Sequence, residues 1–230
     1  MSIRWVVVFA IEGDARFLSH HDLMRLMERA TARAKLPIKY SQGFNPHPRL
    51  SLALPKPVAV ASQCELLVLE LTEPPPPQAQ QDIQQQLPKG MRVLRTLTPS
   101  DKGLVIESVQ YELSLEDAEI EQISQRVAQL QAMDTWEIVR VTGADAHGGG
   151  TKRNMDVKPK IAGLGLRDGK VQFTLLGGQE SARPAEILQL LGFAPDEPAN
   201  EGLASCMQAM SRLQRVSLRC PGLEKDKDAE

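Results

Sequence analysis

The sequence predicts an α+β fold in which two ferredoxin-like (βαββαβ) antiparallel-sheet domains follow one another in tandem, the second decorated by extra segments. The chain of 230 residues is long enough for two domains of about 100 residues each. Its composition, 42% hydrophobic and 24% charged, is typical of a protein with a buried core and excludes wholesale disorder. Strand-like and helix-like stretches alternate in βαββαβ order up to a polar, turn-rich stretch at 98–103. We therefore expect domains at 1–99 and 100–222, followed by a charged flexible tail at 223–230.

The first domain is expected to begin with a strand at 4–10, because this stretch is rich in β-branched and aromatic residues. A helix is expected from Ser19 to about Lys35, since Ser19 is a good N-cap and Asp22 follows at the capping-box position. Its apolar residues recur at three- and four-residue steps, which defines the buried face. Pro37 ends this helix. The other elements expected in this domain are strands at 38–41, 50–54, 65–71 and 91–97, and a short helix at 78–87.

The second domain is expected to repeat this theme with additions. Residues 109–115 alternate between apolar and polar side chains, as in a half-buried strand. Apolar residues at helical spacing between Ile120 and Leu130 predict a helix. A loop with three glycines at 148–150 interrupts the strands that follow. The further elements expected are strands at 136–141, 155–161, 170–176 and 213–220, and helices at 184–191 and 203–210.

The most highly specified stretch of the chain is the loop from Tyr40 to Arg49. A glycine and two prolines restrict its backbone, and each proline favours an extended conformation in the residue before it. Between them stand an aromatic ring, an amide, an imidazole and a guanidinium, which together can hold an anion or stack on a flat ring. The alternative is a wide β-bulge whose prolines protect a sheet edge. The candidate substrate-binding residues in the loop are Ser41, Gln42, Gly43, Phe44, Asn45, Pro46, His47, Pro48 and Arg49.

Basic residues gather in the first 60 residues, where nine Lys and Arg stand against four Asp and Glu. Such an excess attracts phosphate or an acidic protein surface. Arg25, Arg29 and Arg33 fall on one stripe of the expected helix, where they either contact phosphates or keep an exposed face solvated. The candidate substrate-binding set is completed by residues at and after the helix start, namely Ser19, His20, Asp22, Arg25 and Arg29.

A second basic stretch surrounds Asp156. Lys152, Arg153, Asp156 and Lys158 form a candidate secondary basic site, and Pro159 favours an extended backbone there. Asp156 either pairs locally with one of these cations or leaves them to meet nucleic acid or a protein partner. Both interpretations stay open at the level of the sequence.

Motifs within the first 73 residues carry a resemblance to a known family. They are Phe17-Leu18-Ser19-His20-His21-Asp22, Arg29-Ala30, Leu36-Pro37, the Tyr40 to Arg49 loop, and Leu54-Pro55. The chain closely resembles the uncharacterised radical-SAM-linked domain of bacteria in its stand-alone form. The same domain is otherwise fused to the C-terminus of B12-binding-type radical SAM proteins. A weaker second signature of the family resembles Lys152-Arg153 with Asp156-Val157-Lys158-Pro159. The chain departs from the family pattern at His21, where a leucine is expected, and near Ile11, where a lysine is expected.

The resemblance implies an association with radical SAM chemistry and a link to RNA or protein modification. We therefore expect a substrate-binding accessory subunit of a radical SAM modification enzyme, with RNA as the favoured substrate. The iron–sulfur cluster and S-adenosylmethionine are then expected in a partner radical SAM protein. Such a cluster needs three closely spaced thiolates, whereas Cys64, Cys206 and Cys220 form no such triplet. We therefore expect no cofactor in this chain and no catalytic activity of the chain alone.

Two other functions stay open. His20 and His47 are candidate catalytic residues, since a histidine acid–base pair suits cleavage of an RNA phosphodiester. Tandem ferredoxin-like folds with such histidines resemble CRISPR repeat-processing endonucleases, so an RNA-processing or RNA-modifying enzyme is one alternative. A protein-only adaptor is the other. No metal is expected, because His20 and His21 project about 100° apart on a helix and the ligand set is incomplete.

The three cysteines form no C-x-x-C pair and are expected to be ordinary core thiols in a reducing compartment. The longest apolar run is too short to span a membrane, and no N-terminal export signal is visible. We therefore expect a cytoplasmic protein without a membrane partner.

Overall fold

The computed structural model describes residues 2–99, 104–142, 151–178, 180–193 and 200–224. Within these ranges the chain forms an α+β structure with mostly antiparallel strand pairing, which confirms the predicted fold class at that level. Backbone contacts divide the chain into two compact units, one comprising Met1–Glu107 with Gln214–Glu230 and the other Ser108–Leu213. The last strand lies with the first unit, whereas the predicted boundaries assign it to the second domain. The tandem of two ferredoxin-like domains stays a prediction.

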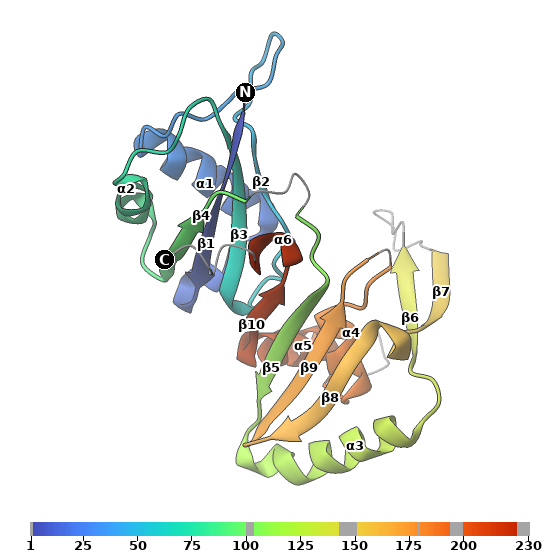
Figure 1. Ribbon diagram of the computed structural model, residues 1–230. Helices are drawn as coiled ribbons and strands as arrows, with labels where there is room; N and C mark the ends of the chain where they lie inside the picture. Colours follow the sequence, from blue (N-terminus) through green and yellow to red (C-terminus); the bar gives the residue numbers. More distant parts are fainter. Residues whose placement is uncertain (1, 100–103, 143–150, 179, 194–199, 225–230) are drawn as a thin grey trace. The chain divides into compact units, whose positions relative to one another are not determined.

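The sheet of the first unit is built around β1 (Ile3–Ile11), most of whose residues are buried. β1 pairs antiparallel with β3 (Ala61–Leu71) on one side and with β4 (Met91–Leu97) on the other. The short β2 (Leu50–Leu52) pairs antiparallel with β3. β10 (Leu213–Arg219) runs parallel to β3, and Figure 1 shows these strands side by side.

Helices cover both faces of this sheet. A short 3-10 helix, η1 (Gly13–Phe17), follows β1 and leads into α1 (His20–Arg33). α1 and α2 (Ala79–Gln86) bury their apolar side chains against β1 and β3 in one core cluster. On the opposite face, α6 (Pro221–Glu224) packs Leu223 against the same two strands in a second, smaller cluster.

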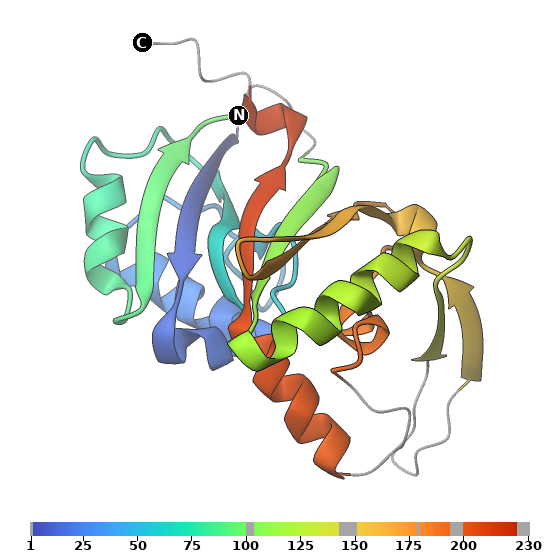
Figure 2. The same ribbon diagram turned by 90° about the horizontal axis from the view of Figure 1, so that it is seen from below.

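In the second unit, the antiparallel strands pair in the order β5 (Ser108–Ser114), β9 (Lys170–Leu176) and β8 (Ile161–Arg167). Its first helix, α3 (Ile120–Ala132), follows the 3-10 helix η2 (Asp117–Glu119). Figure 2 shows α3 beside β8, where the amide of the Gln131 side chain donates to the Leu164 carbonyl at 2.7 Å. The alternating apolar residues of β5 and β9 are buried, as the sequence pattern predicts.

The remaining elements of this unit are additional to these three strands and α3. β6 (Glu137–Thr142) and β7 (Thr151–Asp156) form a separate two-stranded antiparallel sheet. The 3-10 helix η3 (Lys158–Lys160) links β7 to β8, and the unit is completed by α4 (Pro184–Leu190) and α5 (Asn200–Arg212).

Some expected elements differ from those observed. The strand expected at 38–41 is replaced by two isolated bridges, from Ile38 to Leu71 and from Tyr40 to Pro48, because Pro48 has no N–H group with which to continue a ladder. The helix expected to reach Lys35 ends at Arg33, since Lys35 takes the left-handed conformation (φ 52°) that terminates helices. The expected strand at 155–161 is broken by η3. The expected glycine loop at 148–150 and most of the expected tail lie outside the described residues.

No helix among the described residues is long and apolar enough to cross a membrane. The three cysteines are free thiols, of which Cys220 is buried and Cys64 and Cys206 are half-buried. Burial raises the pKa of Cys64 to about 11, and the neighbouring Glu65 carboxylate adds to this shift. Cys64 therefore stays a protonated thiol at neutral pH, as the prediction of core thiols requires.

A buried lysine ties η1 to the chain that leads into β3. Lys56 is only 4% exposed, and its ammonium donates to the backbone carbonyls of Arg16 (2.7 Å), Pro57 (2.9 Å) and Val60 (3.2 Å). Burial lowers the pKa of Lys56 from 10.5 to about 8; Glu65 opposes this shift, while Arg215 and Arg16 add to it. The Lys56 ammonium thus fixes this segment, and it loses its charge when the pH rises through about 8.

We expect the stability difference between the wild type and a Lys56→Met variant to depend on pH. The folded state gives up the Lys56 proton near pH 8 and the unfolded chain near pH 10.5, so the unfolded chain binds more protons between these values. The free energy of unfolding of the wild type, relative to the variant, should therefore rise by about 3 kcal/mol across this window. Urea denaturation at several pH values measures it. A flat difference between the wild type and Lys56→Met across this window would contradict the assignment.

Candidate functional site

The loop from Tyr40 to Arg49, here called the arm, closes on itself near its base. The Ser41 N–H donates to the His47 carbonyl at 2.8 Å, and the His47 N–H donates to Ser41 Oγ at 2.9 Å. The bridge between Tyr40 and Pro48 lies next to this pair. Ser41 is therefore used to shape the arm, and the prolines at 46 and 48 hold the returning side extended.

The base of the arm is fixed to the sheet by its neighbours on either side. The N–H of Arg49 donates to the Lys39 carbonyl at 2.7 Å, and the N–H of Lys39 to the Glu70 carbonyl at 2.8 Å. The Glu70 carboxylate lies 3.5 Å from the Arg49 guanidinium and 3.9 Å from the Lys39 ammonium. All three side chains stay at least 32% exposed, so this surface pairing leaves both cations accessible.

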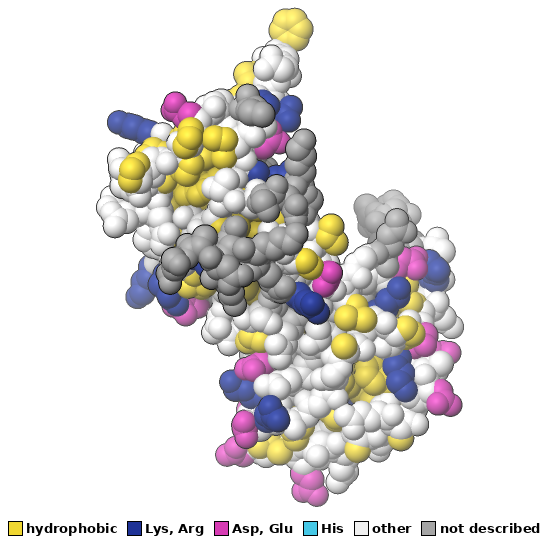
Figure 3. All heavy atoms as spheres, in the orientation of Figure 1, with side chains coloured by type: hydrophobic (Ala, Val, Ile, Leu, Met, Phe, Trp, Pro, Cys, Tyr) yellow, Lys and Arg dark blue, Asp and Glu magenta, His cyan; other side chains and the backbone are white. Residues whose placement is uncertain are grey.

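The far end of the arm carries an unprotected aromatic ring. Gly43 adopts φ +127°, a conformation that side chains other than glycine rarely take, and so turns the chain. Phe44, the next residue, is 111% exposed relative to the reference for its type, and residues 42–47 are all exposed. Figure 1 shows the arm projecting beyond the strand ends of its unit, and Figure 3 shows a hydrophobic side chain at its far end. Such a ring has no folding role and is available to stack on a ligand.

The start of α1 uses two of the predicted site residues for capping. The Asp22 N–H donates to Ser19 Oγ at 3.2 Å, and the Ser19 hydroxyl donates to Asp22 Oδ2 at 2.7 Å. This confirms Ser19 as the N-cap, while Asp22 accepts from the Ser19 hydroxyl rather than from its backbone. His20 Nδ1 is shielded from solvent and has no hydrogen-bond partner within the described residues. The rings of His20 and His21 meet edge to face at 5.9 Å between centroids.

The structure does not bring His20 and His47 together. The arm leaves the sheet at the end where Ile38 bridges Leu71, whose partner in β1 is Ile3. The start of α1 follows β1 at its other end, beyond Ile11. The nine residues of β1 separate these two ends by about 25 Å. No hydrogen bond or ring contact joins the two histidines within the described ranges, and an acid–base pair acting on one bond gains no support.

The three arginines of the α1 stripe differ in their surroundings: Arg33 is structural, whereas Arg25 and Arg29 are open. Arg33 donates to Gln86 of α2 through Nε (2.9 Å, to Oε1) and Nη2 (3.0 Å, to the carbonyl), so it holds two helices together. Arg25 and Arg29 are exposed, and in the described part of the chain neither side chain makes a hydrogen bond or an ion pair. These two remain available to a negatively charged ligand.

The candidate secondary basic site is mostly used within its own unit. Asp156 Oδ1 accepts from the N–H groups of Trp136 (2.8 Å) and Lys158 (3.0 Å). The Lys158 ammonium donates to the Met133 carbonyl and lies 6.0 Å from the centre of the Trp136 ring. Arg153 pairs with Glu180 at 2.5 Å.

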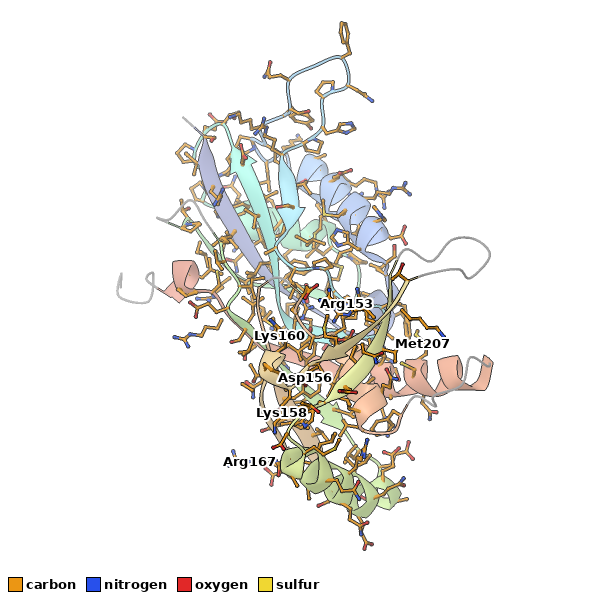
Figure 4. All side chains as sticks on the ribbon, turned by 90° about the vertical axis from the view of Figure 1, so that its right-hand side faces the viewer. Arg153, Asp156, Lys158, Lys160, Arg167 and Met207 are labelled. Atoms are coloured by element: carbon orange, nitrogen blue, oxygen red, sulfur yellow. The ribbon has the colours of Figure 1, made fainter. Side chains whose placement is uncertain are left out.

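Figure 4 shows Arg153, Asp156 and Lys158 spread along β7 and the turn after it rather than converging on one point. Asp156 and Lys158 therefore stabilise the start and end of the β6–β7 ribbon. Lys152 is left exposed at the other end of the candidate site. Among the described residues, no cluster of three His, Cys, Asp or Glu side chains is arranged to hold a metal ion.

The structure contains two buried ion pairs that were not predicted from the sequence. Glu65 and Arg215 are each 1% exposed and pair at 2.8 Å, and Arg215 also donates to the Pro55 carbonyl at 3.1 Å. Arg140 and Glu186, each 10% exposed, pair at 2.8 Å. A glutamate at an inward position of an otherwise apolar strand is the signal that points to the first pair.

Taken together, the fold and the arm define a class: an α+β protein with an exposed, aromatic-tipped arm and two exposed arginines on α1. A family model described as "Uncharacterized protein conserved in bacteria (DUF2344)" matches residues 4–184, so the chain belongs to that family. No curated protein matches the chain. Among solved structures, the chain is similar to a crystal structure assigned as a glycine cleavage system transcriptional repressor. The identity is 12% and the TM-score 0.25, over 96% of this chain and 98% of that one.

Proposed function

We propose that this protein is a substrate-binding accessory subunit of a radical SAM modification enzyme, and that the arm binds the substrate, with RNA favoured. The association with a radical SAM partner rests on the motif resemblance in the first 73 residues. In this proposal the partner carries the iron–sulfur cluster and S-adenosylmethionine, and this chain supplies no catalytic step. The element order β1, α1, β2, β3, α2, β4 of the first unit supports the ferredoxin-like assignment, which we retain as part of the proposal.

The exposure of Phe44 is the observation that carries the proposal. Phe44 is fully exposed on a backbone that hydrogen bonds and prolines fix, so both faces of its ring are open for a ligand to stack on. Single-stranded RNA offers unstacked bases to such a ring. Arg25 and Arg29, without partners in the described residues, are available to its phosphates. A protein-only adaptor remains the alternative, because a pocket on a protein would also cover the ring.

We expect Phe44→Ala to weaken RNA binding about tenfold or more, since stacking of a base on an aromatic ring contributes about 1–3 kcal/mol. Tagged wild-type and variant chains are captured from native bacterial cells, and the bound RNA and proteins are identified. Fluorescence anisotropy with the recovered RNA then gives the affinities. Phe44→Trp should bind as the wild type does. Phe17→Ala is the matched control, because Phe17 is also exposed (47%) but lies outside the arm, against the Arg16 guanidinium at 4.9 Å.

The outcomes separate the two functions. Recovery of a radical SAM protein and of RNA, with loss of the RNA alone in Phe44→Ala, supports the proposal. Recovery of the radical SAM protein without RNA replaces it by the adaptor function. Recovery of neither would overturn the proposal.

A further inference from the structure

A polar cleft opens within the second unit and is not part of the arm. It has a volume of about 640 Å³ and lies between α3, β6 and the C-terminal end of α4. Its apolar lining consists of Ile138, Leu190 and Leu191, all buried. The polar side chains around it are Gln122, Gln125, Arg126, Gln129, Glu137 and Gln189. The volume falls in the range of ligand sites, roughly 300–1,000 Å³.

The lining of the cleft carries one positive and one negative side chain, so it offers no excess positive charge to a polyanion. Arg126 donates through Nε to the Leu190 carbonyl at 2.7 Å and through Nη1 to Gln129 Oε1 at 3.4 Å. The Leu190 carbonyl belongs to the C-terminal end of α4, where the helix dipole is negative, so the one cation of the lining is already engaged. The exposed carboxylate of Glu137 remains. The hydrogen bonds of Arg126 fix its guanidinium in place, whereas the Glu137 carboxylate is open to pair with a basic ligand.

The carboxamides of the cleft match the peptide group. Within the described residues, the side chains of Gln122, Gln125 and Gln189 make no hydrogen bond, so their carboxamide donors and acceptors are open. Gln129 has its oxygen engaged by Arg126 and keeps its amino group for a ligand. Each carboxamide can accept from a backbone N–H and donate to a backbone C=O. Gln122 and Gln129 are about 10 Å apart along α3, the length of about three residues of extended polypeptide.

We propose that this cleft binds an extended polypeptide segment, uncharged or basic, whose backbone hydrogen-bonds to the glutamine side chains. Glu137 then selects a lysine or arginine in the segment, and the apolar lining receives one of its side chains. The site is independent of the RNA contact proposed for the arm. It gives the protein a means of holding a partner protein by its backbone.

The full chain is tested as bait against a displayed library of short random linear peptides. A Gln125→Ala, Gln129→Ala double variant is used for counterselection. We expect the wild type to enrich peptides that contain Lys or Arg and lack Asp and Glu. The affinity of a synthetic enriched peptide, measured by fluorescence anisotropy, should fall about tenfold or more in the double variant. N-methylation of the peptide backbone should produce a similar loss, because it removes the N–H donors.

Ser124→Ala is the matched control, since Ser124 is exposed on α3 but does not line the cleft, and it should bind as the wild type does. Glu137→Gln should weaken a lysine-containing peptide and leave its norleucine analogue unchanged. Absence of enrichment over the double variant overturns the proposal, as does enrichment of acidic peptides. If a single-stranded RNA oligonucleotide competes with the peptide, and this competition is lost when Gln125 is replaced, the cleft binds nucleic acid and the proposal is overturned. None of these results alters RNA capture by the arm, so the two proposals fail separately.

Discussion

Glu65→Gln is expected to lower the free energy of unfolding by about 3–5 kcal/mol, because it removes the carboxylate that pairs with the buried Arg215 guanidinium. Both side chains are 1% exposed, so water cannot replace the lost carboxylate. Arg215 and Lys56 already disfavour each other, and Glu65 is the neighbour that favours the charged form of Lys56. The variant therefore removes a carboxylate that stabilises both buried cations. Urea denaturation at neutral pH measures the loss.

Two further variants test whether this loss of stability comes from the burial of the ion pair. Glu70→Gln removes a carboxylate that also faces two cations but is 32% exposed, and it should change stability by less than about 1 kcal/mol. A double variant, Glu65→Met with Arg215→Met, should recover most of the stability, since well-packed apolar side chains replace a buried ion pair with little change. A loss of under about 1 kcal/mol in Glu65→Gln would mean that the pair is hydrated in solution.

The local parts of the fold follow from the sequence. The strands expected at 91–97 and 170–176 are observed with these bounds, because each is a short run of apolar alternation between turn-forming residues. Ser19 caps α1 as predicted, since capping depends on residues three positions apart. Such features need only neighbouring residues, which the sequence displays directly.

The parts that depend on distant residues do not follow from the sequence. Glu65 and Arg215 are 150 positions apart, and only the parallel pairing of β10 with β3 brings them together. In the sequence, Asp156 stands among basic residues. In the structure its carboxylate accepts a hydrogen bond from the Trp136 N–H, which is 20 positions away. The stiffness of the arm follows from its prolines, whereas its projection from the sheet depends on how Lys39, Arg49 and Glu70 pair. Long-range contacts therefore decide which candidate residues are structural.

Arg140→Met is expected to destabilise the second unit by about 3 kcal/mol. Arg140 donates to both oxygens of Glu186, each at 2.8 Å, and through Nη2 to the Ser181 carbonyl at 3.0 Å. Glu186 also accepts from the Arg183 N–H at 2.8 Å, so the pair joins β6 to the start of α4. The variant leaves a carboxylate at 10% exposure without its cation. Denaturation, together with hydrogen exchange of the β6–β7 backbone, measures the loss.

Arg153→Met is the matched control for this prediction, because Arg153 lies opposite Arg140 in the β6–β7 register and also pairs with a glutamate. Its pair with Glu180 is more than 50% exposed on both sides, so the stability change should stay below about 1 kcal/mol. Equal losses in the two variants would contradict the difference in burial. Because Arg153→Met is expected to fold normally, it also tests the basic stretch of β7. A weaker RNA capture by this variant would assign β7 a direct contact, whereas unchanged capture leaves RNA binding to the arm.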